Sequence, residues 1–486
     1  IDRLMRRTAA RTPAPEADPR RSLTAGLTVV ALVCASCAAL RSYDVELSDT
    51  IALASAGRLK AAIGTLESRG KASQKDLLHF MELGELQRLQ GNLADSQAAW
   101  RKADAMVQAW ERVARSDPAK LLAGAAAYAV NEKLRPYDGH DYEKVMLTTR
   151  IAMNHVALGD WDNARVEIKK THEREAVIAN LRARQVEEIE REAKTRGAKT
   201  QFRELNGYPV ATLDTPEVAA LRNGYQSAFS HYLAGYVYEA LGEPGLAAAG
   251  YRQAIELQPN QPLLERALES LDRPRADDGQ TDLLVVIETG LAPGRQSRGF
   301  SLPIASGNDL VWFPVSFPVL RSEEIGAMPE SIDIDGSGTL AVTPLTSIDA
   351  MARRALQDDL PGIMLRGIIR STVKAAMQKQ ARKRDPQGLS ELAFALGGLL
   401  TESADERGWR TLPARISIAR GRVTLGTQRL RIRTASGVDS VEVDLTGTHA
   451  VVSVRVLGGR VFTLPPGGET KIREARSTFS FAQALW

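Results

Sequence analysis

The sequence predicts an α+β protein in which an all-helical N-terminal half is followed by a β-sandwich-like domain with a helical insertion. Three observations lead to this class. Helical patterns joined by glycine turns recur in the first half, residues 271–282 have the composition of a linker, and apolar residues then alternate with a period of two. With 486 residues, 44% apolar and 25% charged, the chain is large enough for two or three globular domains.

The clearest helical unit is Tyr225–Pro259, where two helical patterns flank a turn at Gly242. Small residues stand where two antiparallel helices must approach closely, and Pro259 ends the second helix. The unit resembles a tetratricopeptide repeat (TPR), whose signature positions are occupied here by His231, Ala234, Gly235, Tyr238, Ala247, Tyr251 and Pro259. His231 and Ala234 depart from the usual residues of that signature.

The spacing of turn glycines supports further units. Gly57 and Gly91 are 34 positions apart, and Gly91 and Gly159 are 68 apart, which leaves room for a degenerate unit around 121–132. The separation from Gly159 to Gly242 is 83, and the excess falls in residues 174–216. We therefore expect a TPR-like helical domain over residues 37–270.

A stripe of side chains in the last unit is the predicted partner-binding groove. Repeat arrays bind partners through the concave face, which is lined by the first helices of successive units. Phe229, Tyr232, Tyr236 and Glu239 share one helical stripe, offset from the side that packs within the pair. The alternative is that a neighbouring unit or the loop at Gly207 covers these rings.

Residues 1–36 are typical of a signal peptide that ends in a lipobox. An arginine-rich start precedes the uncharged run Leu23–Ser36, and Cys34-Ala-Ser-Cys37 follows. The pattern resembles bacterial lipoproteins, with Cys37 as the acylated residue, although Cys34 stands where that pattern usually has Leu. Since Ala38 rather than Asp follows, the resemblance implies a lipid anchor on the periplasmic side of the outer membrane of a Gram-negative bacterium. A cleaved signal and an uncleaved helical anchor are the alternatives.

The net charge of +4 gives little support to nucleic-acid binding. Residues 1–36 contain six arginines and three acidic residues, so they account for +3 of the total and leave about +1 for the remaining chain. A nearly neutral body does not have the basic surface that follows a phosphate backbone. We expect no nucleic-acid partner.

The C-terminal domain, residues 283–486, is predicted from short alternating runs. Three helical runs interrupt them at Ser347–Leu360, Gly362–Arg384 and Leu389–Ala404, so the helical insertion covers about 346–411. Both sets of strands need a facing sheet to bury their apolar sides, which favours a sandwich. The predicted strands are Leu283–Ile287, Leu310–Val319, Ile332–Ile334, Leu340–Val342, Arg415–Ala419, Arg429–Arg433, Ser440–Leu445, Ala450–Leu457 and Val461–Leu464.

No catalytic or metal-binding constellation stands out, so we predict a protein that is not an enzyme and needs no cofactor or metal. No phosphate-binding loop and no nucleophile elbow occurs, and both cysteines lie in the leader. The six histidines show no metal-ligand spacing; they are His79, His140, His155, His172, His231 and His449.

Four segments resemble a little-characterised family of bacterial TPR lipoproteins of the cell envelope. They are Arg135–Glu143, Leu158–Lys170, Leu360–Arg366 and Arg407–Ile418. The resemblance implies no enzymatic activity, and it implies genes that often neighbour those of lipoprotein activators of penicillin-binding proteins. In this chain it highlights a family-motif loop formed by Tyr137, Gly139, Tyr142 and Glu143. The alternative for that loop is a structural connection between units.

Two functions remain after this reading. The first is a membrane-anchored, non-catalytic scaffold whose TPR groove holds a protein partner in envelope assembly. The second is a hydrolase or ligand-binding module in the β-rich domain, with the repeats used for docking. A deep C-terminal pocket with converging Asp, Glu or His449 would favour the second, and a bare repeat groove would favour the first.

Overall fold

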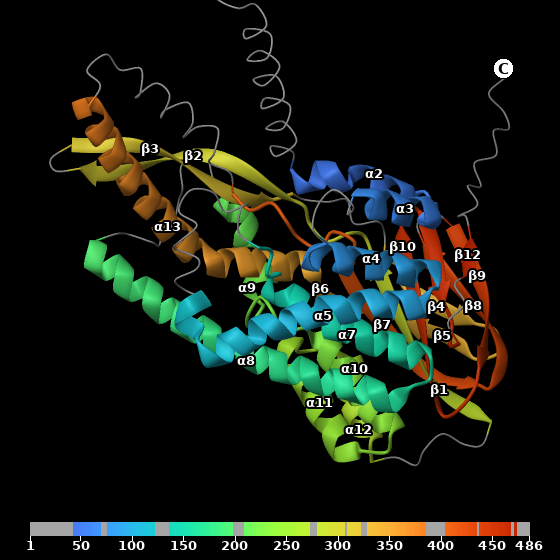
Figure 1. Ribbon diagram of the computed structural model, residues 1–486. Coiled ribbons are helices and arrows are strands. Elements are labelled where there is room, and N and C mark those ends of the chain that lie inside the picture. The colour runs from blue at the N-terminus through green and yellow to red at the C-terminus, as the bar shows by residue number, and fades with distance from the viewer. Residues whose placement is uncertain are drawn as a thin grey trace, which may run out of the picture.

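The computed structural model describes residues 42–69, 75–121, 136–197, 209–272, 279–306, 309–321, 328–384, 404–434, 437–467 and 471–473. The predicted leader, Cys37, the degenerate unit at 122–132 and the helical run at 389–403 lie outside these residues. Helices make up the N-terminal half of the described chain and sheets dominate the C-terminal part, so the structure is α+β (Figure 1). Within the described residues, no helix combines the length and apolar character needed to cross a bilayer.

The N-terminal half consists mainly of helical hairpins. Four pairs pack together: α2 with α3, α4 with α5, α7 with α8, and α10 with α11. A short 3-10 helix, η2, and the helices α9 and α12 complete this half. The bounds are α2 Tyr43–Ser55, α3 Leu59–Arg69, α4 Leu77–Gln90, α5 Leu93–Ser116, α7 Asp141–Ala157, α8 Trp161–Arg196, η2 Val210–Leu213, α9 Pro216–Ala219, α10 Ala228–Ala240, α11 Pro244–Leu257 and α12 Pro262–Ser270.

The predicted turn glycines join the hairpins. Gly57, Gly91, Gly159 and Gly242 all have positive φ, between 74° and 89°. A residue with a Cβ rarely adopts this conformation, so glycine at these positions allows the chain to reverse between paired helices. This part of the sequence prediction is confirmed.

Close helix packing requires glycine at two further positions. A Cβ added to Gly235 of α10 would lie 2.5 Å from the ring of Tyr251 in α11. Gly84 of α4 faces the ring of Trp100 in α5 in the same way, and Trp100 is fully buried. In both hairpins an aromatic ring therefore occupies the space that the missing side chain leaves.

The C-terminal part contains three sheets and one long helix. The strand orders are β12-β11-β10-β1-β7-β6, β5-β4-β8-β9 and β2-β3. β1 pairs in parallel with β10 and antiparallel with β7. The bounds are β1 Gln280–Thr289, β2 Arg295–Ser306, β3 Asp309–Leu320, β4 Ser331–Ile334, β5 Gly338–Ala341, β6 Thr343–Ser347, α13 Ile348–Arg384, β7 Arg415–Thr424, β8 Gly426–Thr434, β9 Gly437–Leu445, β10 His449–Leu457, β11 Arg460–Leu464 and β12 Lys471–Arg473.

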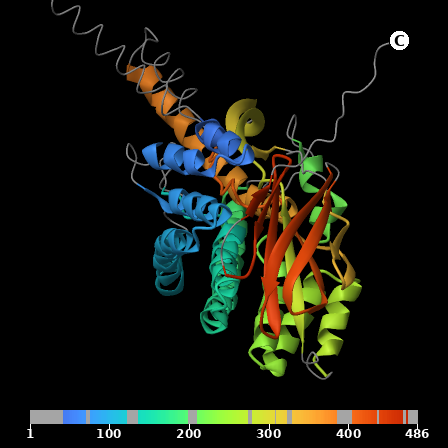
Figure 2. The ribbon, with the colours of Figure 1, turned by 90° about the vertical axis from the view of Figure 1, so that its right-hand side faces the viewer.

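The six-stranded sheet is the middle layer of three. On one side it packs against the four-stranded sheet through an apolar cluster that includes Leu283, Val285 and Ile432. On the other side Leu284 and Val286 join a cluster formed largely by the helical hairpins. Successive side chains of β1 therefore point to opposite layers. Figure 2 shows the sheets lying directly beside the helices.

Buried charges connect the helices to this sheet. Arg150 of α7 forms ion pairs with Glu85 of α4 and Glu288 of β1, and all three side chains are at most 3% exposed. Arg88 of α4 donates to Ser453 of β10 over 2.9 Å. Because an unpaired buried charge is costly, these contacts favour one relative placement of the two halves.

The sequence prediction of the strands is largely confirmed, and that of the insertion is partly wrong. The first two predicted helices form one helix, α13, which continues through Pro361. Residues 404–411 contain no helix and reach the core instead, where Trp409 is 1% exposed. β2, β6 and β12 were not expected. Apolar residues on both sides of Pro361, including Leu356 and Met364, are buried, and this packing offsets the hydrogen bond that proline removes.

Candidate functional site

The predicted partner groove is not an open surface. Phe229, Tyr232 and Tyr236 of α10 are all fully buried. The Phe229 amide donates to the Thr346 hydroxyl oxygen of β6 over 3.0 Å. The prediction that these rings are exposed for a partner is therefore wrong, because the chain's own six-stranded sheet covers them.

Glu239, the fourth residue of the predicted groove, belongs to a polar cluster at the same interface. Arg420 of β7 donates to Glu239 over 2.8 Å and to Asp282 of β1 over 2.7 Å. It also donates to the hydroxyl of Tyr251 over 2.8 Å. The carboxylate thus helps to join α10 to the sheet and is not available to an external partner.

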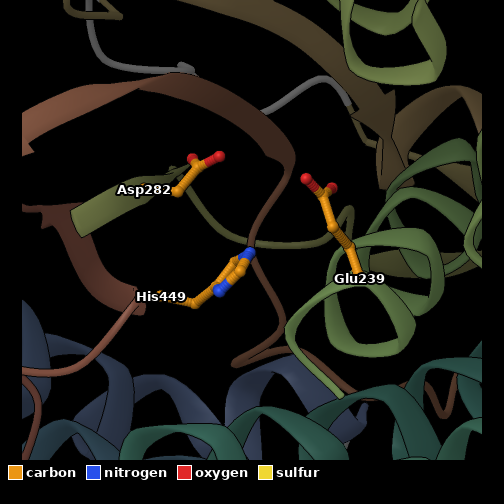
Figure 3. A group of neighbouring side chains, drawn as sticks. All are labelled: Glu239, Asp282 and His449. Atoms are coloured by element: carbon orange, nitrogen blue, oxygen red, sulfur yellow. The ribbon is translucent and has the colours of Figure 1, made fainter. Parts of the chain in front are cut away.

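Glu239, Asp282 and His449 form a cluster that the sequence analysis did not predict (Figure 3). Their candidate ligand atoms lie within 4.8 Å of one another, which makes them a candidate metal site. The Arg420 guanidinium, however, already pairs with both carboxylates. A divalent cation would have to displace it, so this donor set does not fit a resident metal.

The loop Pro136–His140 and the start of α7 hold the family-motif residues. Gly139 has a φ of +78°, and Tyr137, Tyr142 and Glu143 are buried. Glu143 accepts hydrogen bonds from the Tyr137 hydroxyl and, over 2.9 Å, from the His140 amide at the start of α7. The motif therefore has a structural role in starting this helix.

The same loop contacts a second segment that carries the family resemblance. The Trp409 amide donates to Glu143 over 2.7 Å, and His140 Nε2 lies 3.1 Å from the carbonyl oxygen of Arg407. The Arg407 guanidinium lies over the ring of Tyr137, 5.2 Å from its centroid. Segments about 270 positions apart in the chain are thus in direct contact.

A pocket of about 220 Å³ lies beside this contact and is our candidate functional site. Its wall includes the loop 136–141, Trp110 of α5, Arg182 of α8, Arg295 of β2 and Asp359 of α13. Three of the four segments that carry the family resemblance lie at or next to this wall. Figure 1 shows α8, α13 and the β2–β3 hairpin extending on the same side of the molecule.

Most of the charged groups at the pocket are paired. Arg182 bridges Asp141 and Asp359, and Lys144 lies 3.1 Å from Asp141. Burial alone would raise the pKa of Asp141, but the charges of Arg182 and Lys144 outweigh it and lower that pKa. Both carboxylates are therefore held by cations of the chain itself.

Two further groups at the pocket have shifted pKa values. Burial raises the pKa of Asp405, but the hydrogen bonds and charge of Arg407 outweigh it, so the net shift is downward. Burial and then the charge of Arg295 lower the pKa of His140, which is thus neutral at pH 7. Its Nε2 faces a carbonyl oxygen and therefore carries the proton.

The pocket joins residues that sequence reasoning did not connect. Arg182, Arg295 and Asp359 come from α8, β2 and α13, and no short spacing relates them. The only usable signal was the resemblance at Arg135–Glu143 and Leu360–Arg366, which identified two of the contributing segments.

A second pocket, of about 330 Å³, lies between the α9–α10 region and β6. Arg415 there pairs with Glu217 over 3.2 Å. Asn223 Oδ1 accepts from the Gln226 amide over 2.8 Å. Its charged and polar groups are thus largely satisfied within the pocket, so it is the weaker candidate.

Comparisons with known proteins do not assign a family. No family model matches the chain, and no curated protein is significantly similar to it. Among solved structures, a tetratricopeptide repeat protein from Parabacteroides merdae aligns at 13% identity, over 47% of this chain and 98% of that chain, with a TM-score of 0.14. This likeness is too weak to indicate an activity or a partner.

Proposed function

We propose that this protein is a lipid-anchored periplasmic scaffold of the outer membrane that binds a protein partner in cell-envelope assembly without catalysing a reaction. In this proposal the helical hairpins are degenerate TPR units. Their positive-φ turn glycines and aromatic-on-glycine packing support that assignment. The lipobox pattern that ends at Cys37 supports the anchor.

The partner surface in this proposal is the pocket at loop 136–141, and not the inner face of the hairpins. The observation that carries the proposal is the convergence of the family-like segments on that pocket. The six-stranded sheet covers Tyr236 of α10, and Arg88 of α4 and Arg150 of α7 also contact it. A partner must therefore dock outside the helix–sheet interface.

The electrostatics of the pocket support binding over catalysis. A general acid or base works best with a pKa near the operating pH. Asp141 and Asp405 have pKa values lowered below those of free carboxylates, so they stay ionised at pH 7. Each is also held by a cation, an arrangement that orients side chains for recognition.

Membrane fractionation tests the anchor. Cys37→Ala removes the predicted acylation site, so the protein should move from the membrane fraction to the soluble fraction. Cys34→Ala is the matched control, because it leaves Cys37 in place and should stay with the membrane. Unchanged fractionation of the Cys37 variant would show that acylation is not the anchor.

Crosslinked pull-down from envelope extract tests the scaffold. Trp110→Ala and Gln185→Ala remove half-buried side chains from the pocket wall and should each reduce capture of the partner about tenfold. Val186→Ala on α8 is the control, since that side chain is 52% exposed and does not line the pocket. Equal capture by all three variants would place the partner surface elsewhere.

A further inference from the structure

Arg295 of β2 is a buried arginine at the pocket, and two of its nitrogen donors lack hydrogen-bond acceptors. The residue is 4% exposed and lines the pocket wall. Its Nε and Nη2 atoms are both buried, and neither has a hydrogen-bond partner among the described residues. These two nitrogens form one edge of the guanidinium, the edge that binds a carboxylate through two parallel hydrogen bonds.

The other cations of the pocket do not share this condition. Arg182 is bonded to Asp141 and Asp359, and Lys144 lies beside Asp141 and over the ring of Trp110. Leaving a buried guanidinium edge without acceptors costs free energy, which an incoming anion would recover. Among the described cations that line the pocket, only Arg295 shows this shortage of acceptors.

Two titratable side chains near Arg295, His140 and Tyr142, do not supply a negative charge. His140 is neutral, and the positive charge of Arg295 contributes to its lowered pKa. Burial raises the pKa of Tyr142 well above its ordinary value, so this phenol stays protonated despite the nearby guanidinium. Both of these side chains therefore remain uncharged at pH 7.

We propose that the pocket binds a carboxylate of a peptide segment, with the Nε and Nη2 edge of Arg295 as its docking point. This inference rests on the proposed function and identifies the chemistry of its partner. Four aspartates also line the pocket: Asp138, Asp141, Asp359 and Asp405. They would repel a doubly charged phosphate more strongly than a single carboxylate.

The remaining wall suits a short stretch of peptide. Trp110 and Ile363 provide apolar surface, and Gln185 and His140 provide polar groups. A volume of about 220 Å³ accommodates the end of a chain or one acidic side chain with its neighbours, and not a folded domain. The carboxylate can thus come from a C-terminus or from an Asp or Glu side chain.

Calorimetric titration of the full-length protein with three probes tests the proposal. The probes are N-acetyl-trialanine with a free carboxylate, the same peptide as its C-terminal amide, and N-acetyl-Ala-Asp-Ala-amide. We expect binding of at least one carboxylate probe and about tenfold weaker binding of the amide. Preference for the first probe would identify a C-terminus, and preference for the third an acidic side chain.

Variants at Arg295 separate ligand binding from structure. Arg295→Gln should weaken binding of the preferred probe at least tenfold. Arg295→Lys should weaken this binding less, because lysine keeps the positive charge. Arg298→Gln, on the same strand but exposed, is the control and should bind as the wild type does. Arg295→Met should melt at or above the wild-type temperature without ligand, whereas a purely structural role predicts a lower one.

The outcomes distinguish this inference from the scaffold proposal. If no carboxylate probe binds, or if Arg295→Gln binds as tightly as the wild type, the carboxylate site is wrong. The scaffold would still stand if partner capture depends on Trp110 and Gln185. If a probe binds through Arg295 but no partner capture depends on the pocket, the carboxylate site stands and the scaffold proposal fails.

Discussion

The hydroxyl oxygen of Tyr236 in α10 lies 3.0 Å from the main-chain carbonyl oxygen of Ala450 in β10. The same hydroxyl is also bonded to the carbonyl oxygen of Asp282 in β1. One phenol thus bridges two parallel neighbouring strands from the helical side, at the position where the sequence predicted an exposed groove.

Removing this hydroxyl should destabilise the protein. Tyr236→Phe keeps the ring but leaves the two carbonyl groups without this donor, so we expect a loss of about 1–3 kcal/mol in the free energy of unfolding. Tyr238→Phe is the matched control, because no hydrogen bond joins the Tyr238 hydroxyl to another described residue. Urea denaturation of both variants measures the difference, and equal losses would contradict the bridging role.

Replacing Arg420 should create a metal-responsive protein. Arg420→Met leaves Glu239, Asp282 and His449 with their ligand atoms within 4.8 Å and without a cation, at an expected cost of about 3 kcal/mol. Added Zn²⁺ should then raise the melting temperature of the variant but not that of the wild type. A wild type stabilised by Zn²⁺ would show that Arg420 does not exclude the metal.

Glu82 should make stability depend on pH between about 5 and 7. Burial raises its pKa to about 7, although hydrogen bonds from Thr411 and the Arg410 amide oppose the shift. The folded state then holds a proton that the unfolded chain releases, so stability falls as pH rises through this range, by up to about 1.4 kcal/mol per pH unit. The stabilising contribution is complete below the unfolded pKa of this carboxyl group.

Urea denaturation at pH 5 and pH 7 measures this dependence. In Glu82→Gln the amide cannot titrate, so the difference in unfolding free energy between the two pH values should shrink. An unchanged difference would assign the pH dependence to other groups.

Two glycine-to-alanine substitutions should change the stability of the protein in opposite directions. Gly235→Ala places a Cβ 2.5 Å from the Tyr251 ring and should cost about 1–3 kcal/mol. Gly64→Ala in α3 meets no atom within 4 Å and should stabilise the protein by about 0.5–1 kcal/mol, because alanine favours the helix. Thermal melts of both variants check the prediction, which is wrong if both lower the melting temperature.

The sequence was a good guide to local structure. Positive-φ turns at Gly57 and Gly242 and the two-residue alternation of β9 follow from steric rules that act within a few residues. It was a poor guide to what covers an apolar face. The ring stripe of Tyr232 and Tyr236 predicts a face that needs a partner, but periodicity cannot tell a partner protein from the chain's own sheet.

The candidate site was predictable only in part. The motif loop around Gly139 could be identified by resemblance, whereas Arg295 lies in a strand with no regular apolar alternation and gave no signal. Its importance depends on donors left without acceptors, and such a shortage becomes visible only when long-range contacts are known. The ion pair between Arg150 and Glu288 was equally invisible in the sequence, because its partners are 138 positions apart.

β1 lies between β10 and β7 in the six-stranded sheet, and both neighbours come later in the chain. The centre of this sheet can therefore form only after both later strands have been synthesised. The hairpins leave the ribosome before the sheet that shields their inner side, because that sheet needs Arg415–Thr424 and His449–Leu457, which follow them in the chain. Until these strands are made, no sheet covers Phe229 and Tyr236. The nascent chain therefore exposes an apolar surface that is prone to aggregation. A fragment ending before β7 should therefore require chaperone protection or aggregate.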